Sequence, residues 1–433
     1  MTKPSHSNLL LSLLCAAPLL ILIIVTGPLP DSDRAAHSLW AGQLVREGSL
    51  SISPDGVVDD WRAFYPNTVP KPGDLFLGVA GILSGQFIEG IVWFGFAWAV
   101  IFGAMRAAGG RMAGALTGVF LGVNPVFLNL SITRSPAVPF LALLFLGTSS
   151  NSSAAFALSS LVRPEGFIFG VWKALRKKSC PAILIMALSA GLWALVNTLA
   201  CGDLFWSGRE VRYCVSAMGY ETPNVVTYLP WLLLRAVAVL GPLPLAALLS
   251  RASGWELRRP VLLNLLFLWA GLLFGGLVLP RYADQVLLLA VPFAMGAVLD
   301  SFRGKSRVAA VALCLAGAAL PWADTIDSWR TEMALDQDLR AVSALLPDGM
   351  IAANELVVPR LAILDSGRGF PERYVALDRA VWEGAGENDL LAHGVTAIVI
   401  FRDDFYLSDH AEAWVKTLSG RIPLFDISPR WSL

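Results

Sequence analysis

Five aspartates in the segment 30–73 are the first candidates for chemistry in this chain. Asp31 and Asp33 stand directly after the first apolar run, and Asp55, Asp59 and Asp60 follow in the same polar segment. A carboxylate at a membrane surface can accept the proton of a hydroxyl group and so make its oxygen nucleophilic, which is the role of a general base. We therefore take Asp33 as the candidate catalytic residue.

Helix capping is the competing interpretation of the same residues. Asp31, Ser32 and Asp33 precede AAHSLWAGQLV, whose pattern is helical, and helix amino termini favour Asp and Ser. Both roles are filled if Asp31 or Ser32 caps the helix and Asp33 points at a site. Asp59 and Asp60 are paired carboxylates, which suit a divalent metal, the hydroxyls of a sugar, or a solvated turn.

Cationic residues at the expected membrane boundaries supply the groups that an anionic lipid phosphate needs. Arginine offers phosphate oxygens a bidentate fork of donors, and Arg163 and Arg281 each lie in a turn with proline, VRPEG and LPRYADQ. Lys71 in PKPG either pairs locally or meets an anionic head group, and Glu165 can neutralise Arg163. Interfacial anchoring is the alternative for each cation, and we adopt it for Arg134.

Histidines and aromatic residues add little to this set. The four histidines, at positions 6, 37, 393 and 410, are scattered and make no metal constellation, and His37 is interpreted as a surface residue. Four aromatic residues near the aspartates suit either stacking on a sugar ring or a belt at the membrane interface, and the belt is preferred: Trp40, Trp61, Phe64 and Tyr65.

The elements that must position these residues lie in a membrane. Of 433 residues, 55% are hydrophobic and 15% are charged, whereas soluble domains are about 25% charged. The formal net charge is zero, which gives no basic field for nucleic acid. The first apolar run, 8–29, is longer than the roughly 7–15 residues of a signal-peptide core and has no cleavage site, so it is expected to stay as an anchor.

Hydropathy and charge predict about eleven membrane segments, with the amino terminus in the cytoplasm. Two short helices with RPEG at the outer surface are preferred over one helix at 154–175, because the basic cluster at 173–178 belongs on the cytoplasmic side. LPRYADQ is expected to be an external turn. The segments are 8–29, 87–105, 112–130, 136–147, the hairpin 154–175, 182–199, 225–249, 260–279, 286–299 and 308–322.

From residue 323 the composition becomes that of a soluble domain. Helices are predicted at 328–346 and 410–418, and strands at 350–353, 396–401 and 422–427. This small α/β domain has no phosphate-binding glycine motif and no CxxC pair, so we assign it no chemistry. The predicted fold class is thus a polytopic α-helical membrane domain, 1–322, with an external loop at 30–73, followed by an extracytoplasmic α/β domain, 323–433. Cys201 and Cys214 share one external loop, as a disulfide or as two thiols.

The whole pattern resembles the C-type (GT-C) membrane glycosyltransferases, the superfamily of protein O-mannosyltransferases and aminoarabinose transferases. Four passages carry the resemblance, which covers residues 8–322. DSDRAAHSLWAGQLVREG follows a single anchor, and FYPNTVPKPGDLFL comes next. LVRPEGFIFG precedes a basic turn, and LPRYADQVLLLAVP lies late in the membrane region. The outer domain is similar to those of many bacterial members.

The resemblance implies an inverting transfer of a hexose or pentose from a polyprenyl-phosphate donor to a lipid, glycan or protein acceptor. Its setting would be the outer face of the bacterial plasma membrane. By position Asp33 is the base, and Lys71, Arg163 and Arg281 with Tyr282 hold the donor phosphate or shape the site. No cofactor is expected, and a divalent metal has only the pair at 59–60 to bind it. The candidate substrate-binding residues are Asp31, Asp59, Asp60, Lys71, Arg163, Glu165, Arg281 and Tyr282.

Other classes of protein compete with this hypothesis. A transporter or a flippase for lipid-linked sugars predicts two similar halves with paired broken helices, and the sequence has no such repeat. A polysaccharide polymerase or ligase shares lipid-linked substrates and external arginines, but typically carries its large loop late in the chain. Here the loop follows the first helix. An anchor for the outer domain would not need about eleven segments.

Overall fold

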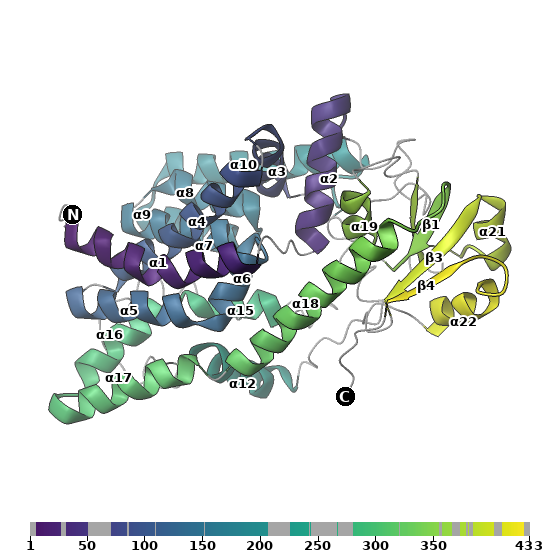
Figure 1. Ribbon diagram of the computed structural model, residues 1–433. Helices are drawn as coiled ribbons and strands as arrows, with labels where there is room; N and C mark the ends of the chain where they lie inside the picture. The colour runs from purple at the N-terminus through teal and green to yellow at the C-terminus, as the bar shows by residue number, and fades with distance from the viewer. Residues whose placement is uncertain are drawn as a thin grey trace. The chain divides into compact units, whose positions relative to one another are not determined.

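The protein is described by a computed structural model, in which two compact units are each assembled from separate stretches of the chain (Figure 1). The first unit comprises Met1–Leu29, Ser84–Gly191 and Thr222–Asp327, and the second comprises Pro30–Leu83, Leu192–Glu221 and Ser328–Leu433. The segment 30–83 is therefore grouped with the carboxyl-terminal domain. The structure describes residues 6–26, 32–50, 71–84, 86–108, 110–150, 152–206, 226–241, 243, 266, 280–319, 321–354, 357–365, 373–377, 380, 384–401 and 409–427.

Apolar helices make up the first unit. Within the described ranges they are α1 (His6–Thr26), α4 (Gln86–Ala107), α5 (Arg111–Val123), α6 (Pro125–Ile132), α7 (Ala137–Ser150), α8 (Ser153–Val162), α9 (Gly166–Lys177), α10 (Cys180–Cys201), α12 (Tyr228–Leu240), α15 (Pro280–Leu288), α16 (Val291–Ser301) and α17 (Gly304–Ala318). The part of α10 from residue 192 onward belongs to the second unit.

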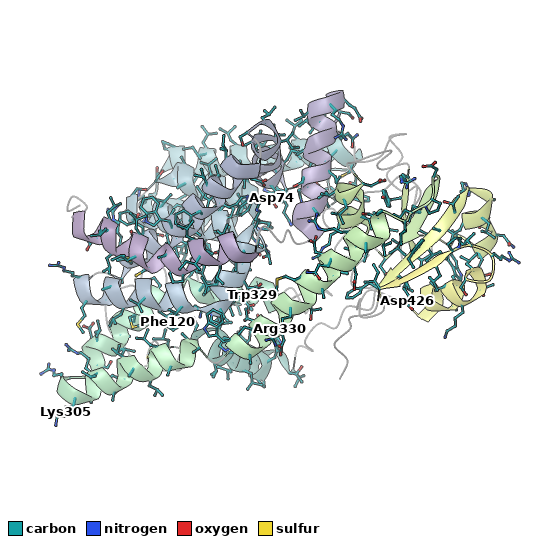
Figure 2. The ribbon with its side chains drawn as sticks, viewed as in Figure 1. Asp74, Phe120, Lys305, Trp329, Arg330 and Asp426 are labelled. Atoms are coloured by element: carbon teal, nitrogen blue, oxygen red, sulfur yellow. The ribbon has the colours of Figure 1, made fainter. Side chains whose placement is uncertain are left out.

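The helices α1, α4 and α5 pack side by side (Figure 1). A glycine allows the close approach, because a Cβ atom at Gly122 of α5 would overlap the carbonyl oxygen of Cys15 in α1. Phe120 of α5 is fully buried, whereas Lys305 at the start of α17 is exposed (Figure 2). Apolar side chains such as Phe120 thus fill the packing between these helices, while Lys305 lies at a helix end.

Two of the described helices are long and apolar enough to cross a membrane, Ile88–Ala107 and Cys180–Cys201. The predicted span at 112–130 is broken rather than straight, because α5 and α6 meet at an angle of 61°. Asn124 occupies the break: its Oδ1 accepts a hydrogen bond from the Phe127 N–H (3.0 Å), and its Nδ2 donates to the Val239 carbonyl oxygen (2.8 Å). Six further apolar stretches of 10–17 helical residues are described, Asn8–Ile23 of α1 among them, and the total of about eleven segments remains a prediction.

The hairpin predicted at 154–175 is confirmed, since α8 ends at Val162 and α9 begins at Gly166. The prediction that LPRYADQ forms a turn is wrong, because most of it is the start of α15. Pro280 is the first residue of that helix, a position where its fixed φ and missing N–H are tolerated. The span predicted at 286–299 is consequently divided between α15 and α16, with the break at 289–290.

A four-stranded parallel sheet forms the centre of the second unit. Its strands are β1 (Met350–Ala353), β2 (Tyr374–Ala376), β3 (Val395–Phe401) and β4 (Leu424–Ile427), in the order β2-β1-β3-β4. The helices described here are α2 (Ser32–Glu47), α3 (Pro72–Ser84), α18 (Trp322–Ser343, from residue 328 onward), α19 (Val358–Leu364), α21 (Glu387–Ala392) and α22 (Asp409–Leu418). The three predicted strands and both predicted helices of the domain are confirmed, with ends shifted by a few residues.

Helices cover both faces of this sheet (Figure 1). Ile351 and Val399 face one way and pack with Leu361 of α19, while Ala352 and Ile398 face the other way toward α21 and α22. Successive residues of a strand point to opposite faces, and a parallel sheet is buried on both, so its strands are apolar throughout. That composition is why β1 and β3 were visible in the sequence.

Helix α2 belongs to the core of the second unit. Trp40 is fully buried and its Nε1 donates a hydrogen bond to the Leu50 carbonyl oxygen (2.8 Å). His37 is 1% exposed, and its ring meets Trp40 edge-on. The predictions of a surface His37 and of an interfacial or sugar-stacking Trp40 are wrong, because α2 packs against α19. The other aromatic residues of that group lie outside the described residues: Trp61, Phe64 and Tyr65.

Candidate active site

The turn between α8 and α9 holds Arg163 and Glu165 in the interior of the first unit. Arg163 ends α8 in an extended conformation (φ −147°, ψ 133°), as the residue before a proline should. The Gly166 N–H donates to the Arg163 carbonyl oxygen (3.0 Å), which closes the turn. A Cβ atom at Gly166 would lie 2.6 Å from the backbone nitrogen of Ser160, so this tight turn requires glycine.

Arg163 and Glu165 form a buried ion pair. The Arg163 Nη2 lies 3.1 Å from Glu165 Oε1, and the two residues are 6% and 8% exposed. Burying a guanidinium costs free energy unless a counter-charge lies beside it. Glu165 supplies that counter-charge, as the sequence suggested. Because the pair is neutral, Arg163 attracts an anion less than an unpaired guanidinium would.

Helix α15 reaches the same carboxylate. Gln285 is fully buried, and its Nε2 donates to Glu165 Oε1 at 2.9 Å. This contact joins residues 120 positions apart, one in VRPEG and one in LPRYADQ. Because Nε2 faces the carboxylate, Oε1 of the same amide faces elsewhere, and within the described part of the chain this buried oxygen has no hydrogen-bond partner.

The preceding residue of α15 makes a second long-range contact. Asp284 Oδ1 accepts from Arg235 Nε at 2.6 Å, and Oδ2 accepts from Arg235 Nη2 at 2.6 Å. The arginine comes from the middle of α12, and the two side chains are 34% and 6% exposed. This is the bidentate arrangement in which a guanidinium fixes the orientation of a carboxylate as well as its distance.

Arg281 and Tyr282 lie in the first turn of α15, and the structure describes their backbone but not their side chains. Positions three and four apart share a helix face, which places Arg281 on the face of Asp284 and Gln285. Sequence reasoning missed both Asp284 and Gln285 because it assigned LPRYADQ to a turn. The available signal was a pair of polar residues directly before an apolar run, at helical spacing from Arg281.

Arg134 also has a carboxylate partner. Its Nη1 lies 2.8 Å from Oε2 of Glu89, and the two side chains are 13% and 14% exposed. Glu89 belongs to the first turn of α4, and Arg134 follows α6 with a positive φ of 53°. The residue expected to be an interfacial anchor is thus an ion-pair partner within the first unit.

Asp33 and Lys71 belong to the second unit. Asp33 is the second residue of α2. The structure describes its backbone but not its side chain. Lys71 directly precedes α3, and its carbonyl oxygen accepts from the Leu75 N–H (3.0 Å). Asp74, which sequence reasoning passed over, is fully buried in the first turn of α3 (Figure 2). A carboxylate there is favoured by the partial positive charge of the helix amino terminus.

Several predicted site residues fall outside the described ranges. These are Asp31, Asp59 and Asp60, so capping by Asp31 and the paired-carboxylate hypothesis stay predictions. Cys214 is also outside them, whereas Cys201 is buried at the end of α10. Among the side chains that are described, no group of three or more His, Cys, Asp or Glu could hold a metal ion.

Comparisons with known proteins place this arrangement in a known fold. No protein-family model and no curated protein sequence matches the chain. The crystal structure of ArnT from Cupriavidus metallidurans bound to undecaprenyl phosphate is similar, with a TM-score of 0.54 and 12% identity, over 96% of this chain and 89% of ArnT. The crystal structure of the same ArnT in the apo state has a TM-score of 0.47 and 12% identity, over 95% of this chain and 89% of ArnT. The chain therefore shares its fold with ArnT, which is itself a GT-C aminoarabinose transferase.

Proposed function

We propose that this protein is an inverting glycosyltransferase that moves a hexose or pentose from a polyprenyl-phosphate donor to an acceptor at the outer membrane surface. The observation that carries the proposal is the similarity of fold, over 96% of the chain, to ArnT bound to undecaprenyl phosphate. That lipid is what remains of a polyprenyl-phosphate-linked sugar once the sugar has been transferred. The contact between Glu165 and Gln285 supports the proposal, because it joins two of the passages that resemble the family.

In the proposed reaction Asp33 removes the proton of an acceptor hydroxyl. The acceptor oxygen forms a bond to the anomeric carbon of the sugar while the bond from that carbon to the phosphate oxygen breaks, so the configuration inverts. The bonding electrons leave with the polyprenyl phosphate. A phosphate leaves without being protonated, so the reaction needs no second carboxylate as a general acid, and nearby cations stabilise the charge that develops.

The ion pairs of the first unit guide the choice of those cations. Arg134, Arg163 and Arg235 each face a carboxylate, which offsets most of their attraction for an anion. Arg163 is therefore a weaker candidate for the donor phosphate, and the resemblance assigns Lys71 and Arg281 to it, with Tyr282 beside the latter. Arg163 and Glu165 shape the site as a neutral pair, and the aspartates Asp31, Asp59 and Asp60 are left for hydroxyl groups of the substrates.

We propose a bacterial plasma membrane as the location, with the amino terminus in the cytoplasm and the carboxyl-terminal domain outside. The charge pattern of the loops supports this orientation, because clusters of Lys and Arg remain on the cytoplasmic side. The proposed chemistry uses no metal, since cations of the protein meet the leaving phosphate. Transfer that persists after dialysis against EDTA would support this, and transfer that returns only with added Mg²⁺ or Mn²⁺ would contradict it.

The test is transfer of radiolabelled sugar from a pool of polyprenyl-phosphate donors in membranes that contain the protein. Wild type is compared with Asp33→Asn, which keeps the size of the side chain and removes the base, and with Asp31→Asn as a matched control. We expect Asp33→Asn to lower transfer at least about a hundredfold, the usual contribution of a general base, and Asp31→Asn, which keeps the base, to lower it far less. Equal transfer by all three proteins would contradict the assignment and favour a polysaccharide polymerase or ligase, or a flippase.

A further inference from the structure

We propose that Asp284 and Gln285 are positioning residues, which hold the first turn of α15 in place for the phosphate of the lipid donor. That turn carries Arg281 and Tyr282. The inference rests on the proposed function for the identity of its ligand. Its geometry comes from the two contacts that α15 makes with α12 and with the turn at 163–165.

The two contacts restrain α15 in two directions. Asp284 and Gln285 are consecutive, so their side chains leave the helix axis about 100° apart. Asp284 is bound by Arg235 of α12, and Gln285 binds Glu165 between α8 and α9. A short helix held from one side can rotate about that contact, whereas two contacts at different angles oppose both rotation and sliding. The nine residues of α15 therefore have a defined position.

Each partner is itself held in place. The Arg235 fork meets both oxygens of Asp284 at 2.6 Å, which fixes the plane of the carboxylate. Glu165 also accepts a hydrogen bond from Arg163. It lies in a tight turn in which the following position, Gly166, has no room for a side chain. Asp284, Gln285 and Glu165 are buried in these contacts, so water competes with them poorly. The position of α15 is consequently determined by two separate helical segments.

The spacing along α15 transmits this restraint to the donor end of the helix. Arg281 precedes Asp284 by three positions and Gln285 by four, so it lies about one turn, or about 5.4 Å, before both and neighbours each of them on the helix surface. A change at either contact shifts the backbone of Arg281. Because phosphate recognition by arginine depends on geometry, even a small shift should weaken the binding of a lipid phosphate.

The experiment measures binding of undecaprenyl phosphate to the purified full-length protein in detergent. The variants are Asp284→Asn and Gln285→Met, which keep the shapes of the side chains. The matched control is Glu89→Gln, which removes the carboxylate of the Arg134 ion pair elsewhere in the same unit. Undecaprenol, which lacks the phosphate, is the control ligand, and a thermal melt without lipid reports the folding of each protein.

We expect Asp284→Asn and Gln285→Met each to raise the Kd for undecaprenyl phosphate about tenfold, equivalent to about 1.4 kcal/mol. Glu89→Gln should change the Kd no more than about twofold, or about 0.4 kcal/mol. A purely structural role would lower the melting temperature and leave the Kd of the folded protein unchanged. The exchange Arg235→Asp with Asp284→Arg should bind the lipid more tightly than Arg235→Asp alone, because it restores an ion pair between α12 and α15.

The outcomes separate this inference from the proposed function. If wild type binds undecaprenyl phosphate better than undecaprenol and both α15 variants bind it equally well, the donor assignment stands and the positioning inference is wrong. An equal loss of affinity in Glu89→Gln would also overturn it, by showing a general effect of ion-pair loss. If wild type does not prefer the phosphate, the donor and the positioning role both fail. Should Asp284→Asn not fold, Gln285→Met decides alone.

Discussion

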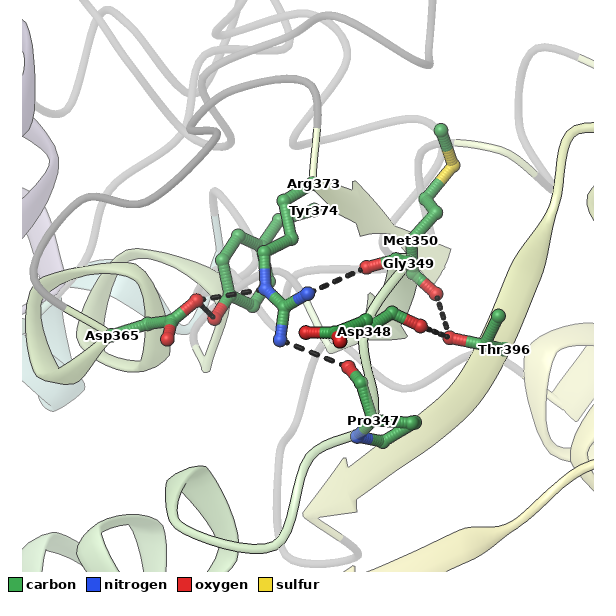
Figure 3. Close-up of polar contacts among 8 residues, drawn as sticks. All are labelled: Pro347, Asp348, Gly349, Met350, Asp365, Arg373, Tyr374 and Thr396. Atoms are coloured by element: carbon green, nitrogen blue, oxygen red, sulfur yellow. Dashed lines mark hydrogen bonds and ion pairs between the residues drawn. The ribbon is translucent and has the colours of Figure 1, made fainter.

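Two clusters of guanidinium, carboxylate and neutral polar side chains, one in each unit, differ in what they hold together. In the second unit Arg373 Nε lies 2.8 Å from Asp365 Oδ2, and the Tyr374 hydroxyl donates to the same oxygen at 3.1 Å (Figure 3). Arg373 also donates to the carbonyl oxygens of Gly349 (2.9 Å) and Pro347 (3.0 Å). This cluster stabilises the end of the sheet at which β1 and β2 begin.

The cluster of the first unit has the same chemical parts and a wider reach. Its contacts join residues 49 and 120 positions apart, from α12, α15 and the turn at 163–165. Its neutral member, Gln285, is a buried amide rather than a hydroxyl. Similar polar groups therefore stabilise one end of a sheet when their partners are local. When their partners are distant in the sequence, they set the arrangement of separate helices.

The largest effect that would sharpen this comparison comes from Arg235→Leu. It leaves the carboxylate of Asp284 buried without its counter-charge, and we expect a loss of about 3–5 kcal/mol in the free energy of unfolding. Asp284→Asn should destabilise less, because the Arg235 side chain is 34% exposed and can be hydrated. Thermal and denaturant unfolding in detergent measure both variants. Equal effects would show that the burial of the two partners does not matter.

A smaller loss is expected for Arg373→Ala. The carbonyl groups of Pro347 and Gly349 lose a donor, but Gly349 is exposed and its oxygen can bind water. We expect a cost of about 1–3 kcal/mol and no change in the Kd for undecaprenyl phosphate. Limited proteolysis of the carboxyl-terminal region and lipid binding are the two measurements. Weaker lipid binding in the folded variant would erase the distinction between the two clusters.

The pKa of Tyr374 provides a third test, through pH. Burial, and then the negative charge of Asp365, raise the pKa of this hydroxyl above its usual value. Above about pH 10 the unfolded chain releases this proton and the folded protein keeps it, so the contribution of Tyr374 to stability is complete below that pH and falls above it. The advantage of wild type over Tyr374→Phe, about 1 kcal/mol at pH 8, should shrink by up to about 1.4 kcal/mol per pH unit. An advantage that is constant to pH 11 would contradict this.

The smallest effect should come from an exposed ion pair. Arg340 Nε lies 2.8 Å from Asp336 Oδ2, one turn apart on α18, with side chains 64% and 35% exposed. Exposed pairs at this spacing contribute about 0.3–0.5 kcal/mol and are screened by salt. Arg340→Gln should therefore change stability by no more than that amount, and by less in 1 M NaCl. A loss comparable to that of Arg373→Ala would mean that burial does not rank these pairs.

Local signals predicted a good part of the fold. Residues 350–353 form a strand as the run of apolar residues indicated, and the break at Arg163 and Pro164 was preferred because the basic cluster at 173–178 belongs on the cytoplasmic side. Short elements such as β2 were missed, because three residues carry too little periodicity. LPRYADQ was misassigned because Pro, Arg and Asp are typical of turns, although a proline also begins helices.

Composition and periodicity were enough to predict apolar helices followed by a small α/β domain, and to find the passages that resemble membrane glycosyltransferases. Composition, periodicity and proline act within a few residues, so they can be read along the chain. The contacts of Gln285 with Glu165 and of Asp284 with Arg235, and the burial of Trp40, became visible in the folded chain alone. Such pairs form between distant segments because a buried polar group must find a partner in space, and no local pattern specifies which one.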